Sequence, residues 1–412
     1  QVEGKDIPMC GVPFHQGENY LSKLLKAGYK VAICEQTETP EESKKRGYKA
    51  IIERKVVRIA TPGTLTEESE LGELGSNYLM ALIALDQNYG SAWVDISTGE
   101  VGCKDCKDFN DLQETCLNKG PSEVLVSKKY FGEKYSKLIP KGFPITFFDF
   151  NKVDLLEVKK KVSEFYKKEE KFNIDNFSNS ELFSLHLILE YVSFTQNGKT
   201  PHLKKPYQIK EKNFLEIDNA SKRNLEIVRT LNGEKEGSLL HSVDYTLTSQ
   251  GKRKLCADLE NPLYSFEEIN DRLNLVEFFY DNFNFTNLSL KEKLKKIPDI
   301  VRASNRLSLR RGSPRDLLSI MQGLFQIDDL ISDVLKRSKE KKFVDSFNSL
   351  IKKIYKNKSL SKIIDELKKA IKENIPIQNK EGNFIREGYD TELDEFRKIR
   401  DDSKSLILEI EK

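Results

Sequence analysis

Several features are scarce in this chain of 412 residues, and each shortage argues against a class of protein. Its six cysteines are too few and too scattered for a disulfide framework, so a reducing compartment is expected. There is no apolar run of about 18 residues, the length that a membrane-spanning helix needs. The first residues, QVEGKDIPMC, lack the apolar segment of a signal peptide. We therefore expect a cytoplasmic protein with no membrane partner.

Catalytic and metal-binding motifs are also missing. The sequence contains no GxxxxGK[ST], GxSxG or HExxH pattern. His186 lies in an apolar segment, where a core histidine is the simpler interpretation than a catalytic base. Cys103 and Cys106 form a single CxxC pair, whereas a structural zinc site needs four ligands. The sequence thus predicts no catalytic residue, cofactor site or metal site in this chain.

Length and composition favour a charge-rich protein of several domains. A single core stops growing at about 250–300 residues, so 412 residues predict two to four domains. Hydrophobic residues make up 38% of the chain and charged residues 32%, which suits a soluble and largely helical protein. Because the chain begins with Gln, we expect it to be a piece of a longer protein.

One short segment concentrates positive charge although the net charge is only +3. Between residues 44 and 58 there are seven cations and one anion. In the strand ERKVVRIATPGT (53–64), alternation predicts Arg54 and Arg58 on one face and Val57 and Ile59 on the other. Such a patch suits a phosphate partner, because neutralised phosphates release counterions. A solvated basic loop is the equally weighted alternative. The candidate phosphate contacts are Lys49, Arg54, Lys55 and Arg58.

The first half of the chain reads as two α/β segments. Residues 17–26 place Tyr20, Leu21, Leu24 and Leu25 on one helical face, with Gly28 as the cap and two strands following. Residues 65–177 begin with strands joined by a hairpin signal at 87–90 and then alternate helices with strands. This pattern predicts a mixed sheet of ribonuclease-H-like style.

From residue 178 onward the sequence predicts helices only. Ser265 followed by Glu268 is a capping box, and Ser313-Pro314 is an N-cap followed by Pro at the first helical position. The last segment, from Thr391, reads as a charged helix. A further basic set, for which a salt-bridged helix face is the preferred interpretation, consists of Arg302, Arg306, Arg310 and Arg311.

Two rival functions stay open at this point. Asp86, Asp95 and Glu100 on neighbouring strands could pair carboxylates around two metal ions, as in a metal-dependent ribonuclease-H-like nuclease. Asp86 and Asp95 also suit ordinary turn chemistry, because Asp bonds its own backbone in turns. The second rival is a helical adaptor without any DNA contact.

A long ordered pattern in residues 218–279 resembles the core-domain signature of the MutS family of bacterial DNA mismatch repair proteins. The pattern consists of Asn224-Leu225-Glu226, Ser238 to Leu240, the Thr-x-x-Gly-x-Arg element (Thr248, Gly251, Arg253), and Pro262 before Arg272-Leu273. The segments IPMCGVPFH, YLSKLLKAGYKVAICEQ and ERKVVRIATPGT are similar to the family's mismatch-recognition domain. REGYDTELDEFRKI resembles the start of its long lever helices.

The resemblance implies an architecture for the whole chain. It implies a partial mismatch-recognition domain at 1–64, a ribonuclease-H-like connector at 65–177 and a helical core with lever helices at 178–412. The fold class is thus multidomain, α/β followed by all-α.

The resemblance also implies a function. Family members bind duplex DNA with mismatches or small loops as homodimers, couple binding to ATP and Mg²⁺, and engage a MutL-like partner through the connector. The family's Phe-x-Glu wedge is expected upstream of residue 1 and its ATPase beyond Lys412. This chain would therefore keep backbone contacts at Lys49, Arg54, Lys55 and Arg58, and would not itself be an enzyme.

Overall fold

The computed structural model divides the chain into two compact units, and each is described by itself. The first unit comprises residues 1–243 and 256–262, and the second comprises residues 244–255 and 263–412. The described residues are all those of the chain except 1–10, 14–15, 48–49, 67–75, 86, 133–134, 136, 138, 151–152, 168–171, 210–213, 216, 283–284, 338–346, 348–357, 376–381 and 411–412.

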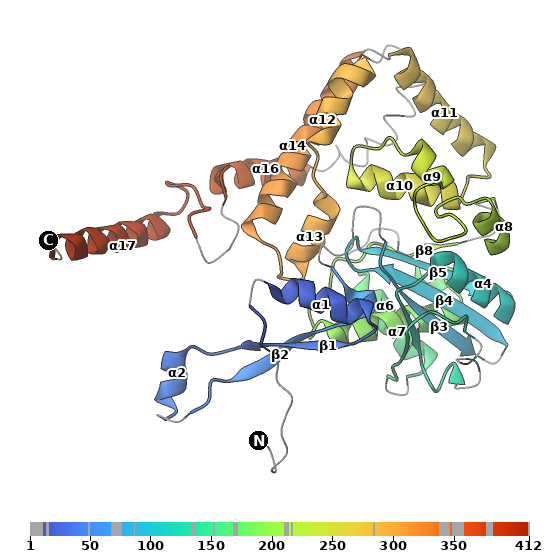
Figure 1. Ribbon diagram of the computed structural model, residues 1–412, viewed down its shortest axis with the longest axis horizontal. Helices are drawn as coiled ribbons and strands as arrows, with labels where there is room; N and C mark the ends of the chain where they lie inside the picture. Colours follow the sequence, from blue (N-terminus) through green and yellow to red (C-terminus); the bar gives the residue numbers. More distant parts are fainter. Residues whose placement is uncertain are drawn as a thin grey trace. The chain divides into compact units, whose positions relative to one another are not determined.

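The first unit begins with a helix packed on a two-stranded antiparallel ribbon. Helix α1 (Gly17–Lys26) lies along strands β1 (Val31–Gln36) and β2 (Arg54–Ala60), as Figure 1 shows. Leu21 and Leu25 are buried against Ala60. Gly28, predicted as the cap, has a φ of +83°, which favours glycine because it has no Cβ.

Only half of the apolar stripe predicted for this helix is buried. Tyr20 and Leu24 are 46% and 44% exposed, because the narrow ribbon covers only the stripe's other side. The predicted strand, turn and helix assignments of this segment are otherwise confirmed.

A six-stranded mixed sheet follows, in the order β7-β6-β3-β4-β5-β8. The antiparallel meander β3-β4-β5 lies at its centre, while β6, β7 and β8 each run parallel to a neighbour. The strands are β3 (Tyr78–Leu85), β4 (Asn88–Asp95), β5 (Glu100–Cys106), β6 (Glu123–Val126), β7 (Ile145–Phe147) and β8 (Tyr207–Gln208). The predicted mixed sheet is confirmed.

The predicted hairpin turn is shorter in the structure. Leu85 pairs with Asn88, so Asn88 and Gly90 lie inside strand β4 rather than in the connection. Gly90 is therefore not a turn residue, and its lack of a side chain matters for packing instead. A Cβ built there would meet the backbone of Ser180 at 2.4 Å, so glycine allows helix α7 (Asn179–Thr195) to approach β4. A close approach of backbones is a second reason for glycine within a strand.

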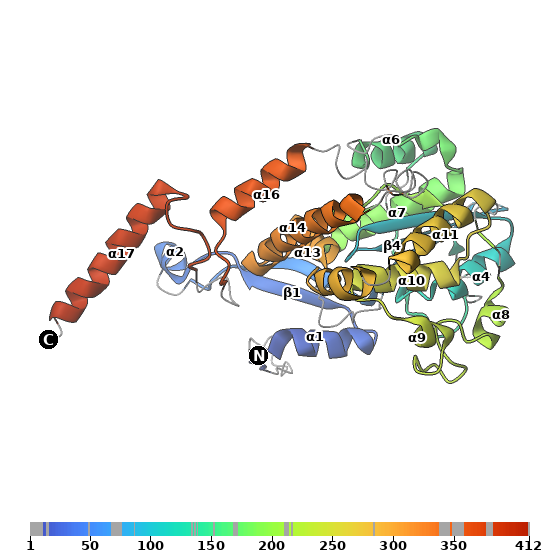
Figure 2. The same cartoon turned by 90° about the horizontal axis from the view of Figure 1, so that it is seen from above.

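Helices cover both faces of this sheet. Helix α7 packs on β3 and β4 and begins with a capping box formed by Ser178 and Glu181 (Figure 2). Trp93 points to the opposite face, where it joins Leu112 of α4 (Phe109–Lys119) in a buried cluster. The first unit also contains α2 (Pro40–Lys45), η2 (Pro62–Thr64), α6 (Leu155–Phe165), η3 (Ile174–Asn176), α8 (Asn219–Asn224) and α9 (Leu239–Val243).

A buried carboxylate, that of Glu123 in β6, joins the ribbon to the sheet. Its Oε2 accepts hydrogen bonds from the Thr61 hydroxyl and from the Gly63 N–H, at 2.5 and 3.0 Å. Its Oε1 accepts from the Thr146 and Tyr191 hydroxyls, at 2.6 and 2.8 Å. A charged group can stay buried when donors saturate it in this way. The Thr-Pro-Gly turn after the ribbon therefore attaches the ribbon to strand β6 of the sheet.

The elements described in the second unit are helices, together with a β-bridge between Ile371 and Ile385. The prediction of helices only from residue 178 onward is wrong at β8, which lies beyond that residue and pairs with the edge of the sheet. Helix α10 (Ser249–Glu260) has its first residues here and its last in the first unit. Helices α14 (Pro314–Arg337) and α17 (Thr391–Ile410) begin at their predicted positions. The second unit also contains α11 (Phe266–Asp281), η4 (Phe285–Leu290), α12 (Lys291–Lys295), α13 (Ile300–Ser308) and α16 (Lys358–Ala370).

Helix α11 begins at the predicted N-cap, where the Ser265 hydroxyl accepts from the Glu268 N–H. The reciprocal bond of the predicted capping box is not present among the described residues, and the Ser265 hydroxyl donates to the Glu267 carboxylate instead. Of its apolar residues, Leu273 and Val276 are exposed, while Phe279 packs on a small cluster around Phe278. No helix among the described residues is long and apolar enough to cross a membrane.

Replacing Glu123 tests how the ribbon is fixed. Glu123→Leu leaves four buried donors without their acceptor and should lower the free energy of unfolding by about 3–5 kcal/mol. Glu123→Gln should cost less, about 1–2 kcal/mol, because its amide oxygen can serve the Gly63 N–H while the Thr146 and Tyr191 hydroxyls rotate. Urea denaturation followed by the fluorescence of Trp93, the single tryptophan, measures both. Equal stability of the Leu variant and the wild type would contradict this account.

His186 predicts a pH dependence of stability. Its ring is buried, packs on Phe150 at 4.7 Å and has no hydrogen-bond partner for Nε2 within the described part of the chain. Burial lowers its pKa to about 4, although Glu190 opposes the shift. Between about pH 6.5 and pH 4, His186 is therefore protonated in the unfolded state but largely neutral in the folded state. Unfolding free energy should fall as pH decreases across this window, and His186→Phe should remove that part of the slope in urea titrations. An unchanged slope in the variant would contradict the assignment.

Candidate nucleic-acid interface

The ribbon that carries the predicted phosphate contacts contains a β-bulge. Arg58 pairs with Ile33 and Val56 pairs with Cys34, so Val57 is an extra residue on β2. An inserted residue reverses the side-chain alternation beyond it. Arg54 pairs with Gln36, three residues along β1 from the partner of Arg58. Arg54 and Arg58 therefore lie on opposite faces of the ribbon.

This register corrects the prediction that Arg54 and Arg58 share one face. Arg58 lies with Ile33 and Ala60 on the side that α1 covers, and it is half-buried. The apolar anchors of the ribbon are accordingly Val31, Ile33 and Ala60 instead of the predicted Val57 and Ile59. Simple alternation fails here because it cannot anticipate an inserted residue.

The two cations at the start of β2 are exposed. Lys55 pairs with Glu35 across the ribbon, and its Nζ lies 3.2 Å from the Glu53 carboxylate. The Arg54 guanidinium makes no hydrogen bond or ion pair with the residues that the structure describes, so it is available to a partner. Lys49, the remaining predicted contact, lies outside the described residues.

The far end of the ribbon is organised by hydrogen bonds around α2 (Figure 1). The Thr39 hydroxyl accepts from the Glu42 N–H at 3.2 Å, and the Glu42 carboxylate accepts from the Thr39 N–H at 2.8 Å. Arg46 pairs with Glu38 and donates to the Ile51 carbonyl at 3.1 Å. Arg46 thus braces the loop, whereas Lys44 and Lys45 are exposed. The basic segment therefore contains cations that stabilise its own loop and exposed cations that a partner could contact.

The chain was compared with known proteins. Three models of one family match it in order: MutS domain I at residues 1–69, MutS domain II at 77–204 and MutS domain III at 220–412. The DNA mismatch repair protein MutS of Wolbachia pipientis wMel is 36% identical over 436 residues. The chain belongs to the MutS family.

Other MutS relatives agree. The proteins of the same name from Ehrlichia chaffeensis and Roseobacter denitrificans are 37% and 35% identical, each over 98% of this chain. The chain spans about half the length of these relatives, namely 50%, 49% and 45% for the Wolbachia, Ehrlichia and Roseobacter proteins.

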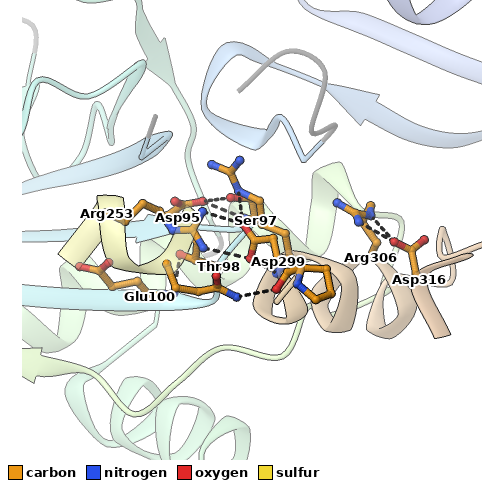
Figure 3. A network of polar contacts seen from close by, with 11 residues as sticks. Asp95, Ser97, Thr98, Glu100, Arg253, Asp299, Arg306 and Asp316 are labelled. Carbon is orange, nitrogen blue, oxygen red and sulfur yellow. Dashed lines mark hydrogen bonds and ion pairs between the residues drawn. The ribbon is translucent and has the colours of Figure 1, made fainter. Parts of the chain in front are cut away.

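The Thr-x-x-Gly-x-Arg element of the MutS-like signature has a physical basis in the second unit. The Thr248 hydroxyl accepts from the Gly251 N–H at 3.0 Å and so holds the first turn of α10. A Cβ at Gly251 would lie 2.9 Å from that hydroxyl. Arg253 donates two hydrogen bonds to the Asp299 carboxylate, at 2.7 and 3.0 Å (Figure 3). The motif therefore ties α10 to the start of α13.

The second basic set is structural in part. Arg306 donates from Nε to the Asp316 carboxylate at 3.0 Å, as Figure 3 shows, and thereby joins α13 to α14. Arg302 is buried with its Nε 3.9 Å from Asp299. Helix α13 ends at Ser308 and Arg310 has a φ of +56°, so the predicted continuous face does not reach Arg310 and Arg311. Ion pairing, the preferred interpretation, is confirmed for Arg306.

The structure does not favour the nuclease alternative. The Asp95 carboxylate accepts from the Ser97 N–H and hydroxyl, at 2.9 and 2.7 Å, which is the predicted turn chemistry. Glu100 accepts from the Tyr207 hydroxyl at 2.8 Å. Asp86 lies outside the described residues. A search of the described part of the chain found no group of three His, Cys, Asp or Glu side chains that could hold a metal.

The CxxC pair is buried. Burial raises the pKa of the Cys106 thiol to about 12, and the pKa of Cys103 is also raised well above its usual range, chiefly by burial. Thiols of this kind are inert, because the thiolate is the reactive form.

Sequence reasoning missed two structural residues of this interface, Glu123 and Arg46. A signal for Glu123 was present, since it is an acid at the head of the apolar strand EVLV. A buried strand admits a carboxylate only where donors converge. Nothing distinguishes Arg46 from its basic neighbours in the sequence.

The Arg253–Asp299 pair yields a prediction for the core motif. The pKa of Asp299 is lowered overall, since burial, which raises it, is outweighed by the hydrogen bonds and charge of Arg253. The pair therefore stabilises the fold above the carboxyl's ordinary pKa of about 4 and loses its effect as pH falls below that value. Arg253→Lys, which cannot form the two parallel bonds, should cost about 1–3 kcal/mol at pH 7 in thermal or urea unfolding. A variant as stable as the wild type at pH 7 would contradict this role.

Proposed function

We propose that this chain is the DNA-contacting and connecting part of a MutS-type mismatch sensor, and that its β1–β2 ribbon grips the backbone of duplex DNA. The observation that carries the proposal is the exposed Arg54, which has no described partner, next to the exposed Lys55 on a ribbon whose base is fixed by Glu123. The relatives named DNA mismatch repair protein MutS support it.

The physics of mismatch detection suits such a grip. A mismatched step is easier to kink and unstack than a paired one, so a protein can detect it by bending the duplex. Contacts to phosphates hold the duplex during bending and carry no sequence information. A stiff ribbon with cations on both faces supplies such contacts: Arg54 on one face, and Lys55 with Arg58 on the other. Lys49 is proposed as a fourth contact.

The remaining proposals concern domains and the longer protein. We propose a partial mismatch-recognition domain at 1–64, a ribonuclease-H-like connector at 65–177 and a core with lever helices at 178–412. For the whole protein we propose a cytoplasmic homodimer that couples mismatched DNA to ATP and Mg²⁺ and binds a MutL-like partner. This chain is proposed to provide DNA contacts and no active site.

Salt dependence of duplex binding tests the grip. Each lost phosphate contact should reduce the slope of log K against log[salt] by about 0.9. Arg54→Ala plus Lys55→Ala should therefore reduce the slope by about 2 and weaken binding at least tenfold. Arg58→Ala should have a smaller effect, because Arg58 is half-buried beside Ile33. Fluorescence anisotropy with a short duplex between 50 and 200 mM salt measures both.

A matched control is Lys159→Ala, which removes one cation from α6 outside the ribbon. It should leave the slope unchanged. An unchanged slope in the Arg54/Lys55 double variant, or an equal loss in the control, would refute the ribbon as the grip and favour an adaptor without DNA contact.

A further inference from the structure

The first unit contains a cleft of about 490 Å³ that the proposed DNA grip does not use. One wall is helix α4 with the residues just before it. The other wall includes the end of α10 and Ile209, Phe214, Leu215, Ile217, Asp218 and Lys222. Its volume lies in the range of pockets that bind small molecules, about 300–1,000 Å³. The cleft therefore has the size for a ligand as well as two distinct walls.

Nine charged side chains line this cleft, four lysines and five acids. Lys104 pairs with Asp111, and Asp108 and Asp218 are helix N-caps. Three others, Lys119, Lys222 and Glu260, lie at or near the ends of helices. Lys119 is the last residue of α4, where Gly120 caps the helix with a φ of +54°. Lys222 follows the α8 cap, at which the Asp218 carboxylate accepts from the Ser221 N–H at 2.9 Å. Glu260 is the last residue of α10. The three groups are thus positioned by the fold.

These charged groups are partly buried without direct partners. The side chains of Lys119, Lys222 and Glu260 make no hydrogen bond, and no ion pair within 4.0 Å, with the part of the chain that the structure describes. Lys119 instead places its ammonium 4.5 Å from the centre of the Trp93 ring. The Oδ1 of Asn118, also lining the cleft, is buried and has no hydrogen-bond partner among the described residues.

The electrostatics agree with this geometry. Burial lowers the pKa of Lys119 and of Lys222, although Glu260 opposes both shifts. Burial also raises the pKa of Glu260 against the effect of the two lysines. A ligand that supplied an anion to the lysines would stabilise their charged forms. A ligand N–H that donated to Glu260 would likewise stabilise its charged carboxylate form.

The opposite part of the cleft is apolar and fixed. Phe214 and Leu215 line it, and the Leu215 N–H donates to the Pro262 carbonyl at 2.9 Å, two residues beyond Glu260. A flat ring can pack on such a surface while its polar edge reaches the charged groups. The apolar residues, the two lysines and the Glu260 carboxylate together suit an amphipathic ligand that carries both an anionic group and a hydrogen-bond donor.

We propose that this cleft binds a nucleoside monophosphate whose base carries an exocyclic amine. Lys119 and Lys222 would hold the phosphate, Glu260 and Asn118 would accept from the amine, and Phe214 and Leu215 would pack on the base. The proposal stands independently of the DNA grip on the ribbon.

Isothermal titration of the 412-residue chain with adenosine 5′-monophosphate tests the site. We expect saturable binding in the micromolar to low millimolar range and at least a tenfold loss of affinity in Lys222→Gln. Lys159→Gln, on α6, is the matched control and should bind like the wild type. Inorganic phosphate and adenosine, titrated separately, should each bind more weakly than the nucleotide.

Glu260→Gln separates recognition of the amine from attraction of the phosphate. It should weaken binding of the nucleotide but strengthen that of inorganic phosphate, because a negative charge beside the lysines is removed. No heat of binding at 5 mM nucleotide, no effect of Lys222→Gln, or equal weakening of both ligands by Glu260→Gln would overturn the proposal. Far-ultraviolet circular dichroism of each variant checks that it is folded, and duplex binding should be unchanged in all of them.

Discussion

The buried carboxylate of Glu123 is the constraint on which the arrangement of the first unit depends. Its four donors come from three segments: Thr61 and Gly63 from the turn after the ribbon, Thr146 from β7 and Tyr191 from α7. Burying a charge is costly unless its hydrogen bonds are complete, so these three segments must meet β6 at one point. Gly63 allows the contact, since a Cβ there would lie 2.7 Å from a methyl group of Leu79.

As a consequence, the ribbon is attached to the sheet at its base and is exposed at its far end. α1 covers one side near Val31 and Ile33, and the bulge at Val57 distributes the cations beyond it over both faces. A charged side chain on a stiff support loses less freedom on binding than one on a loop, because its backbone is already ordered. Such a support suits the proposed grip on the DNA backbone.

Local signals in the sequence predict much of this fold. The N-cap at Ser265, the helix start at Ser313-Pro314 and the glycine cap at 28 are confirmed, because each depends on neighbouring residues only. The family motifs identify the chain for the same reason, since they are long and ordered. The sequence predicts which basic residues lie on the candidate interface. That these residues contact phosphate remains a prediction.

Features that depend on tertiary contacts could not be predicted. No residue near Val57 signals a bulge, so the opposite facing of Arg54 and Arg58 emerged only from strand pairing. Gly90 resembled a turn residue, whereas it admits α7 to the sheet. Arg46 braces a loop, whereas Arg54 has no described partner. This difference depends on the position of Glu38 and on the path of the chain around α2.

The central claim is that the far part of the ribbon lies against the DNA backbone. A photo-cross-linking amino acid placed at position 54, and separately at the exposed position 156 on α6, tests it most directly with a radiolabelled duplex. The account predicts strong cross-linking from position 54 that high salt abolishes, and only background from position 156. Background cross-linking from position 54, or equal yields from the two positions, would contradict it.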